Sequence, residues 1–152
     1  MSNQPKKVLA ISSGGGHWVQ LLRLKPALEG CNAVFVTVNE GYRSDVQEFP
    51  FRVITDATRW EKLKLIWCTL QILWILVKEK PDVVLSTGAA PGYLAIWLGR
   101  RLGAKTLWLD SIANVERLSL SGQRVGSIAD MWLTQWEHLE TPQGPHFKGS
   151  VL

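Results

Sequence analysis

A run of three glycines, preceded by two serines and followed by a histidine, is the part of the sequence best suited to chemistry. The segment Ser12–His17 follows the apolar run Val8–Ile11 and precedes a helical pattern. Backbone N–H groups at a helix start lack partners within the helix, and the helix dipole favours negative charge there. Glycines let a ligand approach the backbone closely. We therefore expect this turn to bind a phosphate or diphosphate, with His17 at its lip.

The turn differs from two common phosphate-binding motifs. It lacks the Lys-Ser/Thr pair of a P-loop, which argues against ATP or GTP hydrolysis, and the spacing of the dinucleotide fingerprint. A tight strand–helix connection that uses glycine for its geometry is the alternative. His17 is a candidate general base, a candidate phosphate ligand, or a residue that bonds locally at a helix start.

Two further segments carry candidate site residues. Thr87–Gly92 is a loop of small residues before a helical pattern, and is either a binding loop or a plain connection with Pro91 near the helix start. Asp110 ends an apolar run, where it is a candidate general base, a ligand for a sugar hydroxyl, or a cap for the next turn. Arg117 and Arg124 are weaker candidates for anion binding, since exposed arginines are usually solvated.

Short apolar runs alternate with helical patterns, which predicts an α/β fold with a Rossmann-like parallel sheet covered on both faces. The predicted strands are Lys7–Ile11, Asn32–Val38, Arg52–Thr55, Asp82–Ser86, Lys105–Leu109 and Met131–Thr134, and the predicted helices are His17–Leu28, Trp60–Lys80 and Tyr93–Leu102. The tail from Thr141 is expected to be irregular. Ligands bind at the carboxyl ends of the strands in such sheets, so the three candidate loops should converge.

Composition limits the function classes. The 152 residues predict one domain, 1–152, and the net charge of +4 is not gathered into the dense stripe of a nucleic-acid binder. Cys31 and Cys68 lack metal spacing, and no acidic pair or histidine cluster suggests a metal. We also expect no signal peptide and no membrane-spanning helix, because no apolar run reaches the length of about 18–20 residues that spanning requires.

The predicted helix Trp60–Lys80 is apolar almost all round, with only a narrow polar stripe. Lysines near both ends suit an anionic lipid surface, and tryptophans are typical of membrane interfaces. A protein partner, or burial inside the same domain, would also explain the pattern. The residues predicted to face the membrane are Leu65, Trp67, Ile72, Trp74, Ile75 and Leu76.

Several motifs in order along the chain resemble one known family. They are Ser13–His17, Lys80–Val84, Gly88–Gly92, Asp110-Ser111, Glu116–Gly122, Ala129-Asp130 and Thr134–Trp136. Together they resemble the membrane-anchoring subunit of the UDP-N-acetylglucosamine transferase of asparagine-linked glycosylation. They resemble even more its bacterial relatives from capsule and exopolysaccharide synthesis.

This resemblance implies the N-terminal, acceptor-binding half of a split glycosyltransferase of the GT-B type. A second small polypeptide would bind the UDP-sugar donor, which is a substrate, so no cofactor is expected. The acceptor would be a sugar on a polyprenyl diphosphate at the cytoplasmic face of the membrane. By the same resemblance, Ser13, Gly14, Gly15, Gly16, His17, Gly88 and Gly92 would line the acceptor diphosphate site. Asp110 and His17 are the candidates for the catalytic base.

Two other functions remain open from the sequence. The chain could be a non-catalytic scaffold that anchors and activates a glycosyltransferase partner. It could also be a stand-alone nucleotide-binding module, which would bind a free nucleotide without any partner.

Overall fold

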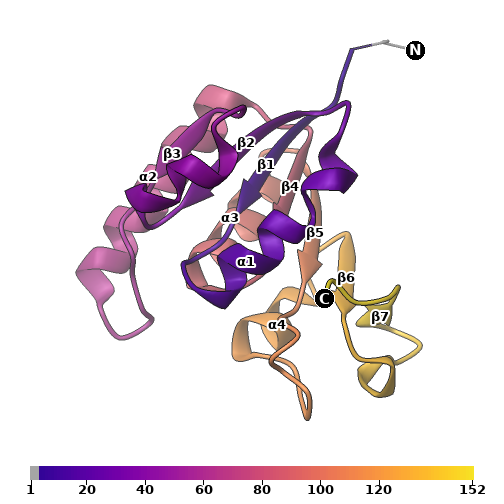
Figure 1. The fold of residues 1–152 in the computed structure, drawn as a ribbon. Coiled ribbons are helices and arrows are strands. Elements are labelled where there is room, and N and C mark those ends of the chain that lie inside the picture. Colours follow the sequence, from indigo (N-terminus) through magenta and orange to yellow (C-terminus); the bar gives the residue numbers. More distant parts are fainter. Residues whose placement is uncertain (1–3) are drawn as a thin grey trace.

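Seven parallel strands form one sheet in the computed structural model, which describes residues 4–152 (Figure 1). The strands are β1 Lys7–Ile11, β2 Asn32–Thr37, β3 Phe51–Val53, β4 Val83–Ser86, β5 Lys105–Leu109, β6 Met131–Thr134 and β7 His146–Phe147. Their spatial order is β3-β2-β1-β4-β5-β6-β7, and every adjacent pair is parallel. This order is that of a Rossmann-like doubly wound sheet with one added edge strand.

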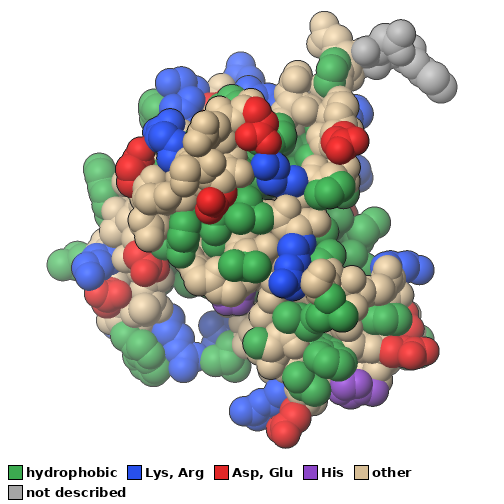
Figure 2. All heavy atoms as spheres, viewed as in Figure 1, with side chains coloured by type: hydrophobic (Ala, Val, Ile, Leu, Met, Phe, Trp, Pro, Cys, Tyr) green, Lys and Arg blue, Asp and Glu red, His purple; other side chains and the backbone are tan. Residues whose placement is uncertain are grey.

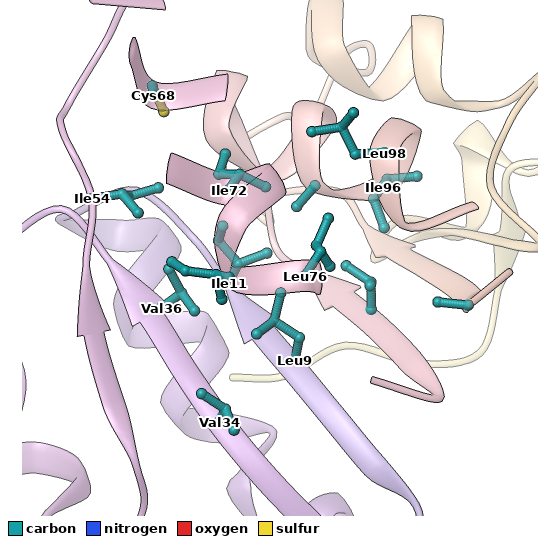
Figure 3. Close-up of a cluster of buried hydrophobic side chains, with 14 of the residues drawn as sticks. Leu9, Ile11, Val34, Val36, Ile54, Cys68, Ile72, Leu76, Ile96 and Leu98 are labelled. Atoms are coloured by element: carbon teal, nitrogen blue, oxygen red, sulfur yellow. The ribbon is translucent and has the colours of Figure 1, made fainter. Parts of the chain in front are cut away.

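Helices cover both faces of this sheet (Figure 1). They are α1 Gly16–Arg23, α2 Lys62–Glu79, α3 Ala89–Arg101 and α4 Leu120–Val125, with 3₁₀ segments at Lys25–Leu28, Glu40–Val46 and Glu137–Leu139. Alternate residues of a strand point to opposite faces, so β1 contributes to two cores. Leu9 and Ile11 pack with residues of α2 and α3, whereas Val8 and Ala10 pack with residues of α1. Figure 3 shows the first core, in which Ile72 and Leu76 of α2 approach the strands.

The predicted helix His17–Leu28 is divided in the structure. α1 ends at Arg23, and a 3₁₀ segment takes over at Lys25. Pro26 explains the break, because its ring and missing N–H do not fit the interior of an α-helix. α3 begins at Ala89, four residues before the predicted start, with Pro91 in its first turn. Proline is tolerated there because the first N–H groups of a helix have no intrahelical partner.

Most predicted strands are confirmed within a residue or two, but some elements were missed. The predicted strand Arg52–Thr55 is β3, Phe51–Val53. The tail contains β7, which pairs with β6, so the prediction that it is irregular from Thr141 is wrong at His146 and Phe147. α4 was not predicted, since its six residues are too short to show a period.

The long helix α2 has one buried side and one exposed side. Its buried residues are Cys68, Ile72, Ile75 and Leu76, all at most 3% exposed. The prediction that Ile72, Ile75 and Leu76 face a membrane is therefore wrong, because their side chains pack against the sheet. Leu65 is half-buried, whereas Trp67 and Trp74 are more than half exposed.

Six large apolar side chains make up the exposed side, which we call the α2 outer face. They are Leu63, Ile66, Trp67, Leu70, Trp74 and Val77, each at least 52% exposed. Among residues 4–152, no helix is both long and apolar enough to span a membrane.

Glu79, at the end of α2, ties this helix to two strands. Its carboxylate contacts Lys7 Nζ of β1 at 2.8 Å and Arg52 of β3 at 2.6 Å, and its side chain is only 10% exposed. Burial by itself raises the pKa of the Glu79 carboxyl, but hydrogen bonds from Lys7 and Arg52 outweigh it and hold the pKa below the ordinary value of 4.5. Folding therefore favours the ionised carboxylate.

Replacing Glu79 by glutamine should lower the free energy of unfolding by about 1–2 kcal/mol at pH 7, allowing for partial solvent screening. A lowered folded pKa makes this contribution complete above the unfolded pKa and removes it as the pH falls through the folded value. In denaturant titrations from pH 7 to pH 3, the difference in stability between the two proteins should therefore narrow as the pH falls below about 4.5. Glu48→Gln, which breaks an exposed pair with Lys25, is the control and should change little. A constant difference between Glu79→Gln and wild type down to pH 3 would contradict this role.

Candidate functional site

The chain leaves the sheet in opposite directions after β1 and β4, its two central neighbours. The loop after β1 leads to α1 on one face, and the loop after β4 leads to α3 on the other (Figure 1). Such a topological switch point opens a crevice outside the carboxyl ends of the strands. The two glycine loops of the sequence therefore meet at this crevice.

A cleft of about 960 Å³ occupies this edge of the sheet. It appears in Figure 2 as a hollow between the segment that leads into α2 and the region of α4, with Lys and Arg atoms on both sides. Its lining comes from segments after five consecutive strands of the sheet. These residues are Ser13, Gly14 and His17; Val38, Asn39 and Tyr42; Asp56–Trp60 and Leu65; Ala89–Pro91, Tyr93 and Leu94; and Ser119–Ser121 with Arg124.

The glycine turn after β1 forms one wall. Gly15 has φ 65°, a conformation open to glycine, and its N–H donates to the Tyr42 hydroxyl at 3.0 Å. A side chain at Gly14 would lie 3.3 Å from the same hydroxyl, which leaves little room for a larger residue. α1 then begins at Gly16 with no side-chain cap and no acidic residue in its first turn. The N–H groups of that turn are thus left for an external acceptor.

His17 joins the glycine turn to the loop after β4. Its Nδ1 lies 3.0 Å from the carbonyl oxygen of Thr87, and the Thr87 hydroxyl donates to the carbonyl of His17 at 2.7 Å. A carbonyl only accepts, so we assign the proton of the neutral imidazole to Nδ1. Nε2 is then an acceptor with a free lone pair, which is the state that a general base requires.

Gly88 and Gly92 have different surroundings. Gly88 has φ 141°, and a Cβ there would collide with the His17 ring. Ala89, next in the chain, has φ 67°, a strained conformation for a residue with a side chain and one that clusters at functional sites. Gly92 is buried against Ser86 and Trp108, so we revise its predicted diphosphate contact to a packing role. Of the other predicted diphosphate-site residues, Ser13, Gly14 and His17 belong to the cleft lining that residues 4–152 form, whereas Gly15, Gly16 and Gly88 do not.

Asp110 is 1% exposed and is absent from the cleft lining formed by residues 4–152. Its carboxylate accepts four hydrogen bonds, from the Trp108 indole, the Asn114 amide, and both the backbone N–H and the hydroxyl of Ser119, at 2.7–3.1 Å. No lone pair is directed at the cleft by this arrangement. We revise its predicted role as general base to that of a residue that positions Ser119 and the start of α4.

The structure adds residues that the sequence did not single out. Asn39 and Tyr42 follow β2, and Asp56 to Trp60 follow β3, so their strand-end positions were the available signal. Arg124 lines the cleft, whereas Arg117, its equal in the sequence, is exposed elsewhere. In the part of the chain that the structure describes, no three His, Cys, Asp or Glu side chains gather to hold a metal ion.

Comparison with known proteins places this chain in a family. Residues 50–150 match the family described as "Oligosaccharide biosynthesis protein Alg14 like". The chain belongs to the Alg14-like family. The UDP-N-acetylglucosamine transferase subunit ALG14 of Rattus norvegicus is 26% identical over 165 residues, covering 88% of this chain and 76% of the rat protein. The subunit alg14 of Schizosaccharomyces pombe is 38% identical over 68 residues, covering 40% of this chain and 31% of the yeast protein.

Solved structures confirm the predicted Rossmann-like fold of this Alg14-like chain, a fold of the kind that makes up one half of a GT-B glycosyltransferase. MurG of Acinetobacter baumannii superposes with a TM-score of 0.70 at 17% identity, covering 97% of this chain and 45% of MurG. UDP-N-acetylglucosamine 2-epimerase of Rickettsia bellii has a TM-score of 0.68 at 16% identity, covering 88% of this chain and 40% of the epimerase. The chain thus spans less than half the length of either protein.

Asp110→Asn tests the structural role of this carboxylate in the Alg14-like chain. An amide nitrogen in place of either oxygen would face a donor, since both oxygens now accept hydrogen bonds. We expect the free energy of unfolding to fall by about 2–4 kcal/mol, measured by chemical denaturation. Glu116→Gln, at an exposed position between Asp110 and Ser119, is the matched control and should leave stability unchanged. Unchanged stability of Asp110→Asn with lost glycosyl transfer would instead return Asp110 to the role of base.

Proposed function

We propose that this chain is the acceptor-binding half of a two-component bacterial glycosyltransferase of polysaccharide biosynthesis. In this proposal, a small donor-binding subunit holds a UDP-sugar, and the sugar passes to a sugar already carried on a polyprenyl diphosphate. The two subunits form a heterodimer at the cytoplasmic face of the membrane. The UDP-sugar is consumed as a substrate, and no cofactor takes part.

One observation carries the proposal: His17 stands beside the glycine turn in a cleft with mostly apolar walls. The turn offers N–H groups to a diphosphate. Leu65, Tyr93 and Leu94 line the same space, which suits the lipid-linked side of the acceptor. His17 is held by Thr87 and by the lack of a side chain at Gly88.

In the proposed mechanism, Nε2 of His17 takes the proton from the acceptor hydroxyl. The hydroxyl oxygen forms a bond to the anomeric carbon of the donor sugar as the bond from that carbon to UDP breaks, and UDP leaves as the anion. The hydrogen bond from Nδ1 to Thr87 fixes the ring and leaves Nε2 as the free nitrogen of a side chain that lines the cleft. A positioned base of this kind typically contributes a factor of 10²–10⁴ in rate, as an order of magnitude.

The need for a partner is supported by what the relatives are. The ALG14 relatives are named as subunits of a UDP-N-acetylglucosamine transferase. A subunit works together with at least one other polypeptide, and in this proposal that polypeptide is the donor-binding subunit.

The α2 outer face supports attachment to the membrane surface. Its six apolar side chains lie in one stripe, and basic residues flank them at Lys62, Lys64, Lys78 and Lys80. Arg52 and Lys78 also lie over the Trp74 ring, at 5.9 and 4.7 Å from its centroid. An apolar stripe rimmed by cations is the pattern of a helix that lies in the interface of an anionic bilayer.

A non-catalytic scaffold is the second candidate function. The buried and fully bonded carboxylate of Asp110 favours it, because it leaves His17 as the one base proposed from the sequence that reaches the cleft. The two functions differ in what happens when His17 is altered: a scaffold would keep its activity, whereas a catalytic half would lose it.

Glycosyl transfer to a prenyl-diphosphate-linked sugar tests the proposal, with this chain alone and together with its donor-binding partner. We expect transfer only with both. In the complex, His17→Ala and Gly88→Ala should each lower kcat by at least about 100-fold, because one removes the base and the other displaces its ring.

Gly30→Ala is the matched control, since Gly30 also has a positive φ, of 80°, but nothing lies within 4 Å of its Cβ position. Full activity of His17→Ala in an intact complex would support the scaffold. Transfer by this chain alone would overturn the two-component architecture.

Leu70→Asp should weaken membrane attachment while leaving the fold intact, because Leu70 is 52% exposed at the centre of the α2 outer face. Loss of one buried leucine is worth about 1.5–3 kcal/mol, so co-sedimentation with vesicles rich in phosphatidylglycerol should weaken at least about tenfold. Leu102→Asp, an equally exposed leucine at the end of α3, is the control and should bind as wild type does. Equal binding of Leu70→Asp and wild type would show that the membrane is contacted elsewhere.

A further inference from the structure

Two arginines line the cleft, and neither forms an ion pair with residues 4–152, which is also true of Arg23, Arg101 and Arg117 outside the cleft. Arg43 pairs with Glu40, Arg52 with Glu79 and Arg100 with Asp130. No ion pair formed within residues 4–152 includes Arg59 or Arg124. Their guanidinium groups are therefore available to an external anion.

These arginines reach the cleft from opposite sides of the switch point. Arg59 lies in the segment between β3 and α2, and Arg124 lies in α4, which follows β5. β2 and β1 lie between β3 and the crevice, and β4 alone lies between β5 and the crevice. Figure 2 shows Lys and Arg atoms on both sides of the hollow.

Each arginine has a neighbour that also lines the cleft. The guanidinium carbon of Arg59 lies 4.6 Å from the centroid of the Trp60 ring, a cation–π contact with another residue of the lining. Arg124 is on the same helix as Ser121, which also lines the cleft. Asp56 is the single carboxylate in the lining that the described residues form, so positive charge prevails there.

We infer that Arg59 and Arg124 bind the acceptor's diphosphate from its two sides and select a diphosphate over a monophosphate. This inference rests on the proposed function. The glycine turn beside His17 accommodates one phosphate group through backbone N–H groups. The second phosphate group then takes the two guanidinium forks, whose planar donors match phosphate oxygens in pairs. A monophosphate occupies the glycine turn and leaves the arginines unused.

Direct binding of farnesyl diphosphate and farnesyl monophosphate, measured by isothermal titration calorimetry, tests this selection. The full chain should bind the diphosphate at least about tenfold more tightly. Arg59→Gln and Arg124→Gln should each weaken the diphosphate about tenfold and change the monophosphate less than about twofold, in line with the worth of a charge-assisted hydrogen bond. Both side chains are exposed, so neither variant should unfold the chain.

Arg117→Gln is the matched control. It removes the same charge from an exposed residue outside the cleft and should bind both probes as wild type does. Equal weakening of both probes in Arg59→Gln and Arg124→Gln, or no weakening of either, would overturn the selection and leave the proposed function standing. Failure of wild-type protein to bind either probe would count against the proposed function itself. Lysine at either position should restore binding only in part, because it keeps the charge but lacks the fork.

Discussion

The paired contacts between His17 and Thr87 hold together the two loops on which the site depends. The chain turns to one face of the sheet after β1 and to the other after β4, so these loops would separate without a link across the crevice. Nδ1 of His17 donates to the carbonyl of Thr87, and the hydroxyl of Thr87 donates to the carbonyl of His17. Because two bonds fix both backbone and ring, His17 has one orientation relative to the glycine turn. Gly88 completes the constraint, since any larger residue would occupy the space of the ring.

The far wall of the cleft depends on a buried charge. Asp110 gathers donors from Trp108, Asn114 and Ser119, and Ser119 in turn accepts from the N–H of Gly122 to begin α4. This carboxylate fixes the start of α4, a helix of only six residues that is too short to be stable alone. Asp110 therefore helps to position Arg124, although Asp110 itself does not line the cleft. A carboxylate at a strand end can thus contribute to a site by fixing the backbone around it.

Much of the fold could be predicted because its signals are local. Apolar runs gave the central strands, and alternation with helical patterns gave the parallel sheet. The glycine turn and the loop after β4 could be paired because both follow strands. The roles of Asp110 and Gly92 could not be predicted, because each depends on residues that come close only in the folded chain. Asp110 contacts Ser119, and Gly92 packs against Ser86 and Trp108. Tyr42 and Arg59 were missed for the same reason, because neither belongs to a motif that indicates a site.

The α2 helix shows where periodicity stops being informative. When both sides of a helix are apolar, the sequence cannot say which side meets the sheet, and here the side with Ile72 and Leu76 does. The opposite side then stays in contact with water unless something covers it, and six large apolar side chains in one stripe exceed what a protein without a partner ordinarily exposes. That stripe begins at Leu63, close in sequence to Trp60 and Leu65 of the cleft lining. The segment that enters α2 thus supplies an apolar wall of the cleft as well as the first side chain of the α2 outer face, which is what the proposed function asks of one helix: to serve an acceptor with both a diphosphate and a lipid portion.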